Sequence, residues 1–148
     1  MHFYQFTPSP EEEDLLTQFK MQCYLHTTIH PYVFKGNETL LQLFKNDFIN
    51  GITLTAPGFY APQGRKITLA VTQEQFYDDI VKFSHGYYRI TNFEMETAAL
   101  YGFSKLMGHR CVSLNVLLAN RATGTFSNNP SKAVDVLIQK ALAVIKQL

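Results

Sequence analysis

Apolar residues recur along the chain with helical and strand-like periods in turn. Between Thr7 and Leu25 they are spaced as on one face of a helix. Ser9 can cap this helix, Pro10 fits its first position, and Glu12 completes a capping box with Ser9. The pattern therefore predicts a well-defined first helix.

The rest of the chain continues this alternation. Further helices are predicted at residues 37–46, 71–86, 95–108 and 128–148, and strands at 31–36, 87–94 and 111–120. The segment 51–60 is predicted to begin as a strand and to end in a Pro-Gly loop. The strand at 111–120 is almost continuously apolar, which is typical of a central strand covered on both faces. No linker or repeat divides the sequence. We therefore expect a single α/β domain over residues 1–148.

Composition and charge narrow the class of protein. The chain has 148 residues, of which 46% are hydrophobic, and these numbers favour a packed globular domain. The formal net charge of +1 gives no electrostatic case for nucleic acid or a membrane surface. No apolar run approaches the roughly 20 residues that span a bilayer, and the N-terminus has no signal pattern. A cytoplasmic protein is expected.

The two cysteines, Cys23 and Cys111, are not in a CxxC pair. Two free, buried thiols are expected, with a single disulfide as the alternative. The histidines show no metal-binding spacing, and no Walker, GxGxxG or GxSxG motif is present. We therefore expect no metal site.

Two acids, Glu94 and Glu96, lie where a predicted strand gives way to a predicted helix. In α/β sheets this junction is where ligands commonly bind. The alternative is that both carboxylates are first-turn residues favoured by the helix dipole. Acids two residues apart do not share a helix face, so a glycosidase pair is not implied.

A second stretch, GFYAPQGR (58–65), brings Phe59, Gln63 and Arg65 into one loop after a strand. An aromatic face, an amide and a guanidinium suit a planar ring with an imide edge. Phe59 can stack, Gln63 offers donors and an acceptor, and Arg65 can bind a carbonyl oxygen. An ordinary surface loop is the alternative.

Taken together, these stretches resemble nucleoside phosphorylases, in particular the uridine phosphorylase branch. The matching segments are GITLTAPGFYAPQGR (51–65), ITNFEMETAALYGFSKLMGH (90–109) and LNVLLANRAT (114–123), in the family's order. The family's Glu-Met-Glu motif opens a helix, and its Phe-x-x-x-Gln-x-Arg pattern binds the pyrimidine. The resemblance implies a phosphorylase/nucleosidase-like α/β fold with a mixed central sheet flanked by helices.

The resemblance also implies roles at the base. Phe59 would stack near the nucleoside, Gln63 would pair with the O2 and N3 edge of uracil, and Arg65 would hold the O4 side. Purine-cleaving relatives carry Ser-Asp where this chain has Asn120-Arg121. Without that acid a pyrimidine is favoured, and Arg121 would brace the loop or lie at the surface.

At the sugar, the resemblance implies that Glu96 would accept hydrogen bonds from the ribose hydroxyls and Met95 would pack under the ribose. Glu94 would order the loop or assist at the ribose. The implied catalytic residues are Arg65 and Glu96. The implied reaction is reversible phosphorolysis of uridine to uracil and ribose 1-phosphate, with inorganic phosphate as co-substrate and no cofactor.

The match covers only the C-terminal half of the family, because the chain begins at what resembles the middle of a member. Members carry their glycine-rich phosphate loop and phosphate-binding arginines in the N-terminal half. A piece of a longer enzyme, an interrupted gene and one half of a split enzyme all remain open. We expect a chain that is inactive alone and that forms a homo-oligomer or pairs with a complementary N-terminal half.

Three functions compete. The first is the nucleoside-binding half of a uridine-phosphorylase-like enzyme. The second is a non-catalytic module that binds uracil or uridine. The third is a structural or assembly remnant without a ligand. A related enzyme hypothesis is a nucleosidase that uses water in place of phosphate.

Overall fold

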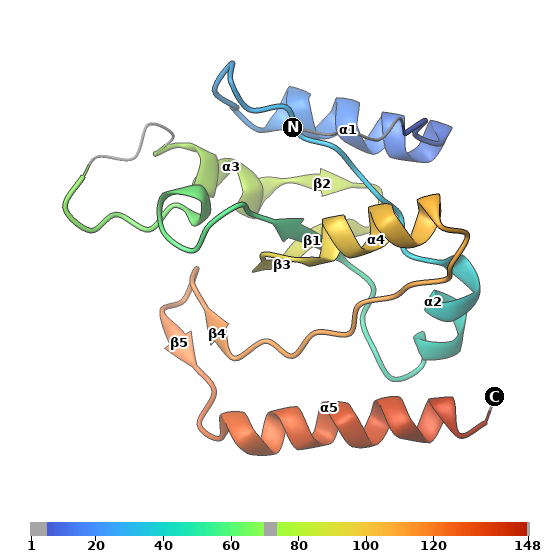
Figure 1. Ribbon diagram of the computed structural model, residues 1–148. Coiled ribbons are helices and arrows are strands. Elements are labelled where there is room, and N and C mark those ends of the chain that lie inside the picture. Colours follow the sequence, from blue (N-terminus) through green and yellow to red (C-terminus); the bar gives the residue numbers. More distant parts are fainter. Residues whose placement is uncertain (1–5, 70–73, 148) are drawn as a thin grey trace. The chain divides into compact units, whose positions relative to one another are not determined.

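The computed structural model describes residues 6–69 and 74–147 (Figure 1). The chain forms two compact units, each assembled from two stretches of sequence. The first unit comprises residues 1–35 and 51–109, and the second comprises residues 36–50 and 110–148.

The first unit is built on a three-stranded mixed sheet with the strand order β1-β3-β2. β1 (Ile52–Thr55) runs parallel to β3 (Tyr88–Glu94), and β2 (Ser84–His85) pairs antiparallel with β3. The register of β1 against β3 shifts after Ile52, so that Thr55 ends beside Glu94. The predicted α/β class with a mixed sheet is confirmed.

Three helices in the described part of the first unit lie next to this sheet (Figure 1). They are α1 (Pro10–Gln22), α3 (Phe76–Lys82) and α4 (Thr97–Leu106), with a short 3₁₀ turn, η1 (Ala61–Gln63), after β1. The start of α1 is as predicted, because Ser9 caps the helix and Glu12 closes the capping box.

Aromatic and aliphatic side chains form the core of the first unit. The ring centroids of Phe19 on α1 and Phe83 after α3 lie 5.5 Å apart in an edge-on arrangement. Cys23 and Ile80 complete the buried cluster, against which partly buried side chains of β1 and β3 pack. The core therefore attaches α1 and α3 to the sheet.

A buried carboxylate joins three segments of the same unit. Glu12 is only 2% exposed. Its Oε2 accepts hydrogen bonds from the Ser9 amide at 2.7 Å and from the Lys105 ammonium at 2.8 Å, and its Oε1 accepts from the Lys35 amide at 2.9 Å. Burial raises the pKa of Glu12, but these hydrogen bonds outweigh it, so the pKa lies below its ordinary value. Glu12 thus connects the start of α1 to the end of α4.

α4 also packs closely against the segment before the second unit. A Cβ atom on Gly102 would lie 2.7 Å from the ring of Phe34. Only glycine allows this approach of helix and ring.

The second unit contains α2 (Glu38–Phe44) and α5 (Pro130–Ile145), which contact each other, and a two-residue hairpin of β4 (Ala119–Asn120) and β5 (Thr125–Phe126). Asn37 and Asn129 cap the two helices through their side-chain oxygens. The predicted helices at 37–46 and 128–148 are confirmed over these ranges.

The prediction of a central strand at 111–120 is wrong for residues 111–118, which form no regular structure. Only Ala119 and Asn120 enter a ladder, with β5 as partner. A strand needs a neighbouring strand to bind its backbone groups, and an apolar sequence alone does not supply one. The Leu117 side chain is 61% exposed, so this segment lacks the predicted cover.

Two smaller predictions also fail. Residues 31–36 are irregular in place of a strand, and the Lys35 amide donates to the Glu12 carboxylate in place of a strand partner. The helix predicted at 71–86 is shorter, since α3 covers Phe76–Lys82 and Ser84–His85 form β2. Residues 71–73 of that prediction lie outside the described residues.

Both cysteines are free thiols, and Cys23 is buried as predicted whereas Cys111 is only half-buried. Within residues 6–69 and 74–147, no helix combines the length and the apolar character needed to cross a bilayer.

We predict that Glu12→Gln lowers the free energy of unfolding by about 2–3 kcal/mol at pH 7, because a buried charged acceptor and its ion pair are lost. The pKa of Glu12 is lowered by folding, so its stabilisation is present above the ordinary glutamate pKa of about 4.3 and disappears as the pH falls through the folded-state value. The difference from wild type should therefore shrink below about pH 4.

Chemical denaturation of both proteins across this pH range measures the effect. The matched control is Glu13→Gln, which changes an exposed neighbour on the same helical turn and should cost less than about 0.5 kcal/mol. Equal losses in the two variants would contradict the assignment.

Candidate functional site

The two predicted motifs follow the ends of neighbouring parallel strands. β1 leads into the loop with Phe59, Gln63 and Arg65, and β3 leads into Glu94–Thr97 at the start of α4. Figure 1 shows β1 and β3 side by side in the sheet. Because parallel strands end at the same edge, both motifs leave the sheet at one edge, which is the usual place for a ligand in α/β folds.

Glu94 is bound at both carboxylate oxygens. Oε1 accepts a hydrogen bond from the Thr55 hydroxyl, and Oε2 accepts from the Glu96 amide at 2.7 Å and the Thr97 amide at 2.6 Å. Burial raises the pKa of Glu94, but these donors, together with the Thr97 side chain, hold it below its ordinary value. Glu94 is therefore a carboxylate at neutral pH that orders the turn between β3 and α4.

Glu96 and Met95 occupy the turn itself and are exposed at the surface. Glu96 stands at the N-cap position of α4, yet its side chain makes no capping hydrogen bond. Its carboxylate accepts from the Met95 amide at 3.2 Å. Both side chains are therefore presented at the edge where the strands end.

The loop after β1 is held together by Arg65. Its guanidinium carbon lies 3.6 Å from the centre of the Phe59 ring. Nη1 donates to the Phe59 carbonyl and to Gln63 Oε1, each at 2.5 Å. The Arg65 amide donates to the Tyr60 carbonyl at 2.9 Å, which closes the loop. The three predicted base-binding residues are thus brought together.

Gly64 permits this loop shape, because it ends η1 with φ of 70°, in the left-handed region. Gln63 just before it is buried, at 5% exposure, and its side-chain oxygen faces Arg65. The predicted pairing of Gln63 with a base edge would therefore involve an amide oxygen that Arg65 already orients. The positive charge of Arg65 lies over the Phe59 ring. Such a charge suits a bound ligand that develops negative charge.

Arg121 belongs to the second unit, where it is half-buried in the turn between β4 and β5. The preceding Asn120 orders this turn, since its Oδ1 accepts from the Ala122 and Thr123 amides at 3.0 and 3.3 Å. The substrate role of Arg121 stays a prediction.

Thr55 also lies at this candidate site, although the sequence motifs do not single it out. Its hydroxyl accepts from the Ala98 amide at 3.0 Å while it donates to Glu94. A threonine at the end of a strand is ordinary in sequence, and only the register against β3 gives it this position.

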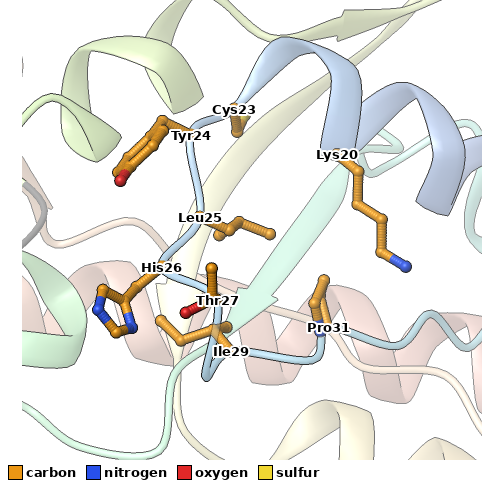
Figure 2. Close-up of a pocket in the computed structure, with 8 residues that line it drawn as sticks. All are labelled: Lys20, Cys23, Tyr24, Leu25, His26, Thr27, Ile29 and Pro31. Atoms are coloured by element: carbon orange, nitrogen blue, oxygen red, sulfur yellow. The ribbon is translucent and has the colours of Figure 1, made fainter.

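A cavity of about 300 Å³ lies away from these residues, at the C-terminal end of α1. Figure 2 shows the side chains that line it, and they come from the end of α1 and the loop that follows: Lys20, Cys23, Tyr24, Leu25, His26, Thr27, Ile29 and Pro31. Burial, together with the charge of Asp79, raises the pKa of Cys23 to about 11, so this thiol is not a nucleophile at neutral pH. His26 is bound to Thr28 at 2.8 Å. The cavity contains none of the predicted site residues.

Across the described part of the chain, no three His, Cys, Asp or Glu side chains gather in a group that could hold a metal ion.

Comparison with known proteins identifies related sequences and folds. No family model matches the chain. The chain is 29% identical over 100 residues to a uridine phosphorylase of Thermococcus kodakarensis, and the match covers 66% of this chain and 34% of that protein. The fold matches the crystal structure of a Trypanosoma brucei nucleoside phosphorylase, described as showing uridine phosphorylase activity, with a TM-score of 0.78 and 19% identity.

The structural match covers 95% of this chain and 49% of the trypanosomal one. The chain therefore has a nucleoside phosphorylase fold. Its resemblance to nucleoside phosphorylases, and to uridine phosphorylase in particular, is confirmed. The chain spans about a third of the curated relative and about half of the solved structure.

We predict that the two acids of the motif differ in their effect on stability. Glu94→Gln should lower the free energy of unfolding by about 1–3 kcal/mol at pH 7, because a charged acceptor of hydrogen bonds from Thr55, Glu96 and Thr97 is lost. Glu96→Gln should change it by less than about 0.5 kcal/mol, since its carboxylate is exposed.

Folding lowers the pKa of Glu94, so its contribution exists above the ordinary glutamate pKa of about 4.3 and is lost as the pH falls through the folded-state value. Denaturant titrations of both variants at pH 7 and pH 3.5 test this. A larger loss in Glu96→Gln would show that the roles are reversed.

Proposed function

We propose that this chain carries the nucleoside-binding part of a uridine-phosphorylase-like glycosyltransferase. The observation that carries the proposal is the placement of both motifs after adjacent parallel strand ends, with the three loop residues gathered around Arg65. The sequence similarity to a uridine phosphorylase supports uridine as the substrate.

In this reaction the C1′–N1 bond of uridine breaks, and its electron pair stays on uracil. An oxygen of inorganic phosphate then bonds to C1′ and gives ribose 1-phosphate. Arg65 would stabilise the negative charge that develops on uracil, with Gln63 orienting the ring and Phe59 contacting it. No covalent enzyme intermediate and no resident cofactor is required.

Glu96 would bind the ribose hydroxyls. Its carboxylate is exposed where the strands end, and it is a hydrogen-bond acceptor that does not cap α4. Met95 would pack against the apolar face of the sugar. Glu94 would order the turn that presents both residues. Positioning of the ribose and stabilisation of charge are the contributions of these residues to rate.

The phosphate site is not assigned to residues of this chain. We propose that it comes from a second polypeptide, either another copy or a complementary N-terminal half, and that the assembly is cytoplasmic. The apolar exposure of α5 supports association, because four of its side chains are between 42% and 51% exposed: Val136, Ile138, Leu142 and Ile145.

The function is tested by uracil release from uridine, with and without phosphate, alongside calorimetric titration of the chain with uridine. Phosphate-dependent release supports the enzyme, binding without release supports a binding module, and release with water alone supports a nucleosidase. Absence of both binding and release would overturn the proposal.

Arg65→Lys and Glu96→Gln should each weaken uridine binding about 10- to 100-fold, because the first loses the planar donor group and the second loses the charged acceptor for the ribose hydroxyls. Arg65→Lys keeps the charge but loses the planar contact with Phe59. Arg89→Lys in the β2–β3 hairpin and Glu13→Gln on α1 are matched controls and should bind like wild type. Unchanged affinity in both site variants would refute the assignment.

The association is tested by sedimentation velocity over a range of chain concentrations. We expect the sedimentation coefficient to rise with concentration, because exposed apolar helix faces favour self-association. A monomer at all concentrations that also melts at high temperature would argue against it.

A further inference from the structure

The start of α4 is capped from outside the helix. The first turn of a helix leaves backbone N–H groups without helical acceptors. Here the Glu96 and Thr97 amides donate to Glu94, and the Ala98 amide donates to Thr55 at 3.0 Å. The acceptors therefore come from the last residue of β3 and the last residue of β1.

Thr55 and Glu94 act as a pair. A hydroxyl has one proton, and because Thr55 Oγ1 accepts from the Ala98 amide, its own proton is directed to Glu94 Oε1. Glu94 Oε2 then points to the Glu96 and Thr97 amides. The β1–β3 register places the two residues beside each other, which makes the contact possible.

Glu96 has the N-cap position but no capping hydrogen bond from its side chain. A glutamate in this position can turn toward the amides of the first turn, as acidic residues do at helix starts. Glu94 already accepts from the Thr97 amide and Thr55 from the Ala98 amide, so the Glu96 carboxylate is left at the surface.

We propose that Thr55 is a positioning residue of the ribose-binding site. Its hydroxyl fixes the rotamer of Glu94, Glu94 fixes the backbone of Glu96, and together they cap α4 so that the Glu96 carboxylate faces the sugar. The ribose-positioning role of Thr55 depends on the proposed function. The hydrogen bonds from Thr55 to Glu94 and from the Glu96 amide to Glu94 do not depend on it.

The test compares Thr55→Val, which keeps the shape and removes the hydroxyl, with Thr55→Ser, which keeps the hydroxyl. Thr53→Val is a matched control, because Thr53 lies two residues earlier on β1 and its hydroxyl also binds a β3 side chain, Asn92, at 3.0 Å. All variants are made in the full chain.

The first readout is independent of any ligand. In a carboxyl-carbon NMR titration, Thr55→Val should raise the pKa of Glu94 toward its ordinary value and shift the Glu96 amide resonance. Thr55→Ser and Thr53→Val should leave both signals as in wild type. An unchanged Glu94 titration in Thr55→Val would overturn the proposal.

The second readout separates positioning from simple stabilisation. Thr55→Val should weaken uridine binding about tenfold and leave uracil binding unchanged, since only uridine carries the ribose. Thr55→Ser should restore uridine affinity. Equal weakening of both ligands, or of neither, would overturn the positioning role.

Failure of the proposed function is recognised separately, because wild type would then bind no uridine while the NMR readout still decides the hydrogen-bond chain. If Thr55→Val does not fold, Thr55→Ala and Thr55→Ser differ from each other only by the hydroxyl and give the same comparison.

Discussion

The first unit depends on how the backbone amides at the start of α4 are satisfied. β3 passes into α4 with only Met95 and Glu96 between them, so there is no room for a separate capping loop. The acceptors are Thr55 and Glu94, at the ends of two paired strands. The register of β1 against β3 therefore determines how α4 begins, and the start of α4 determines where the candidate site lies. A change in the register would alter both. The ionised Glu94 also faces the positive end of the α4 dipole, which favours its charge.

The loop after β1 is ordered by the side chain of Arg65. Arg65 binds a backbone carbonyl, the Gln63 amide oxygen and the Phe59 ring with one guanidinium group. A planar group with several donors can do this, whereas a lysine ammonium cannot match the ring and both oxygens together. The consequence is a positive charge whose position is set before any ligand arrives. Preorganised charge of this kind is what stabilises a leaving anion without a proton donor.

Local signals in the sequence predicted local structure well. The capping box of Ser9 and Glu12 and the Asn37 cap are set by contacts within one turn, so their residue types suffice to predict them. The strand prediction for residues 111–118 failed. Their apolar character indicates burial in a sheet, but whether they pair with other strands depends on segments far away in the sequence. Thr55 was missed for the same reason, since its role depends on the register against β3. The loop residues were found from motif spacing, but the stacking of Arg65 on Phe59 needed the structure.

The Glu-Met-Glu motif raised the question of whether its acids are helix-start residues or ligands for a substrate. The structure separates them. Glu94 behaves as a helix-start acid, because its Oε2 accepts from the amides of Glu96 and Thr97, although it belongs to the strand. Glu96 has the helix-start position and does not cap the helix. The helix-start explanation therefore applies to Glu94, and the ligand explanation is the one that we propose for Glu96. If an acid at the start of a helix is to stay exposed, another acceptor must bind the backbone amides of the first turn. In the Glu-Met-Glu motif Glu94 binds the amides of Glu96 and Thr97, and Glu96 stays exposed.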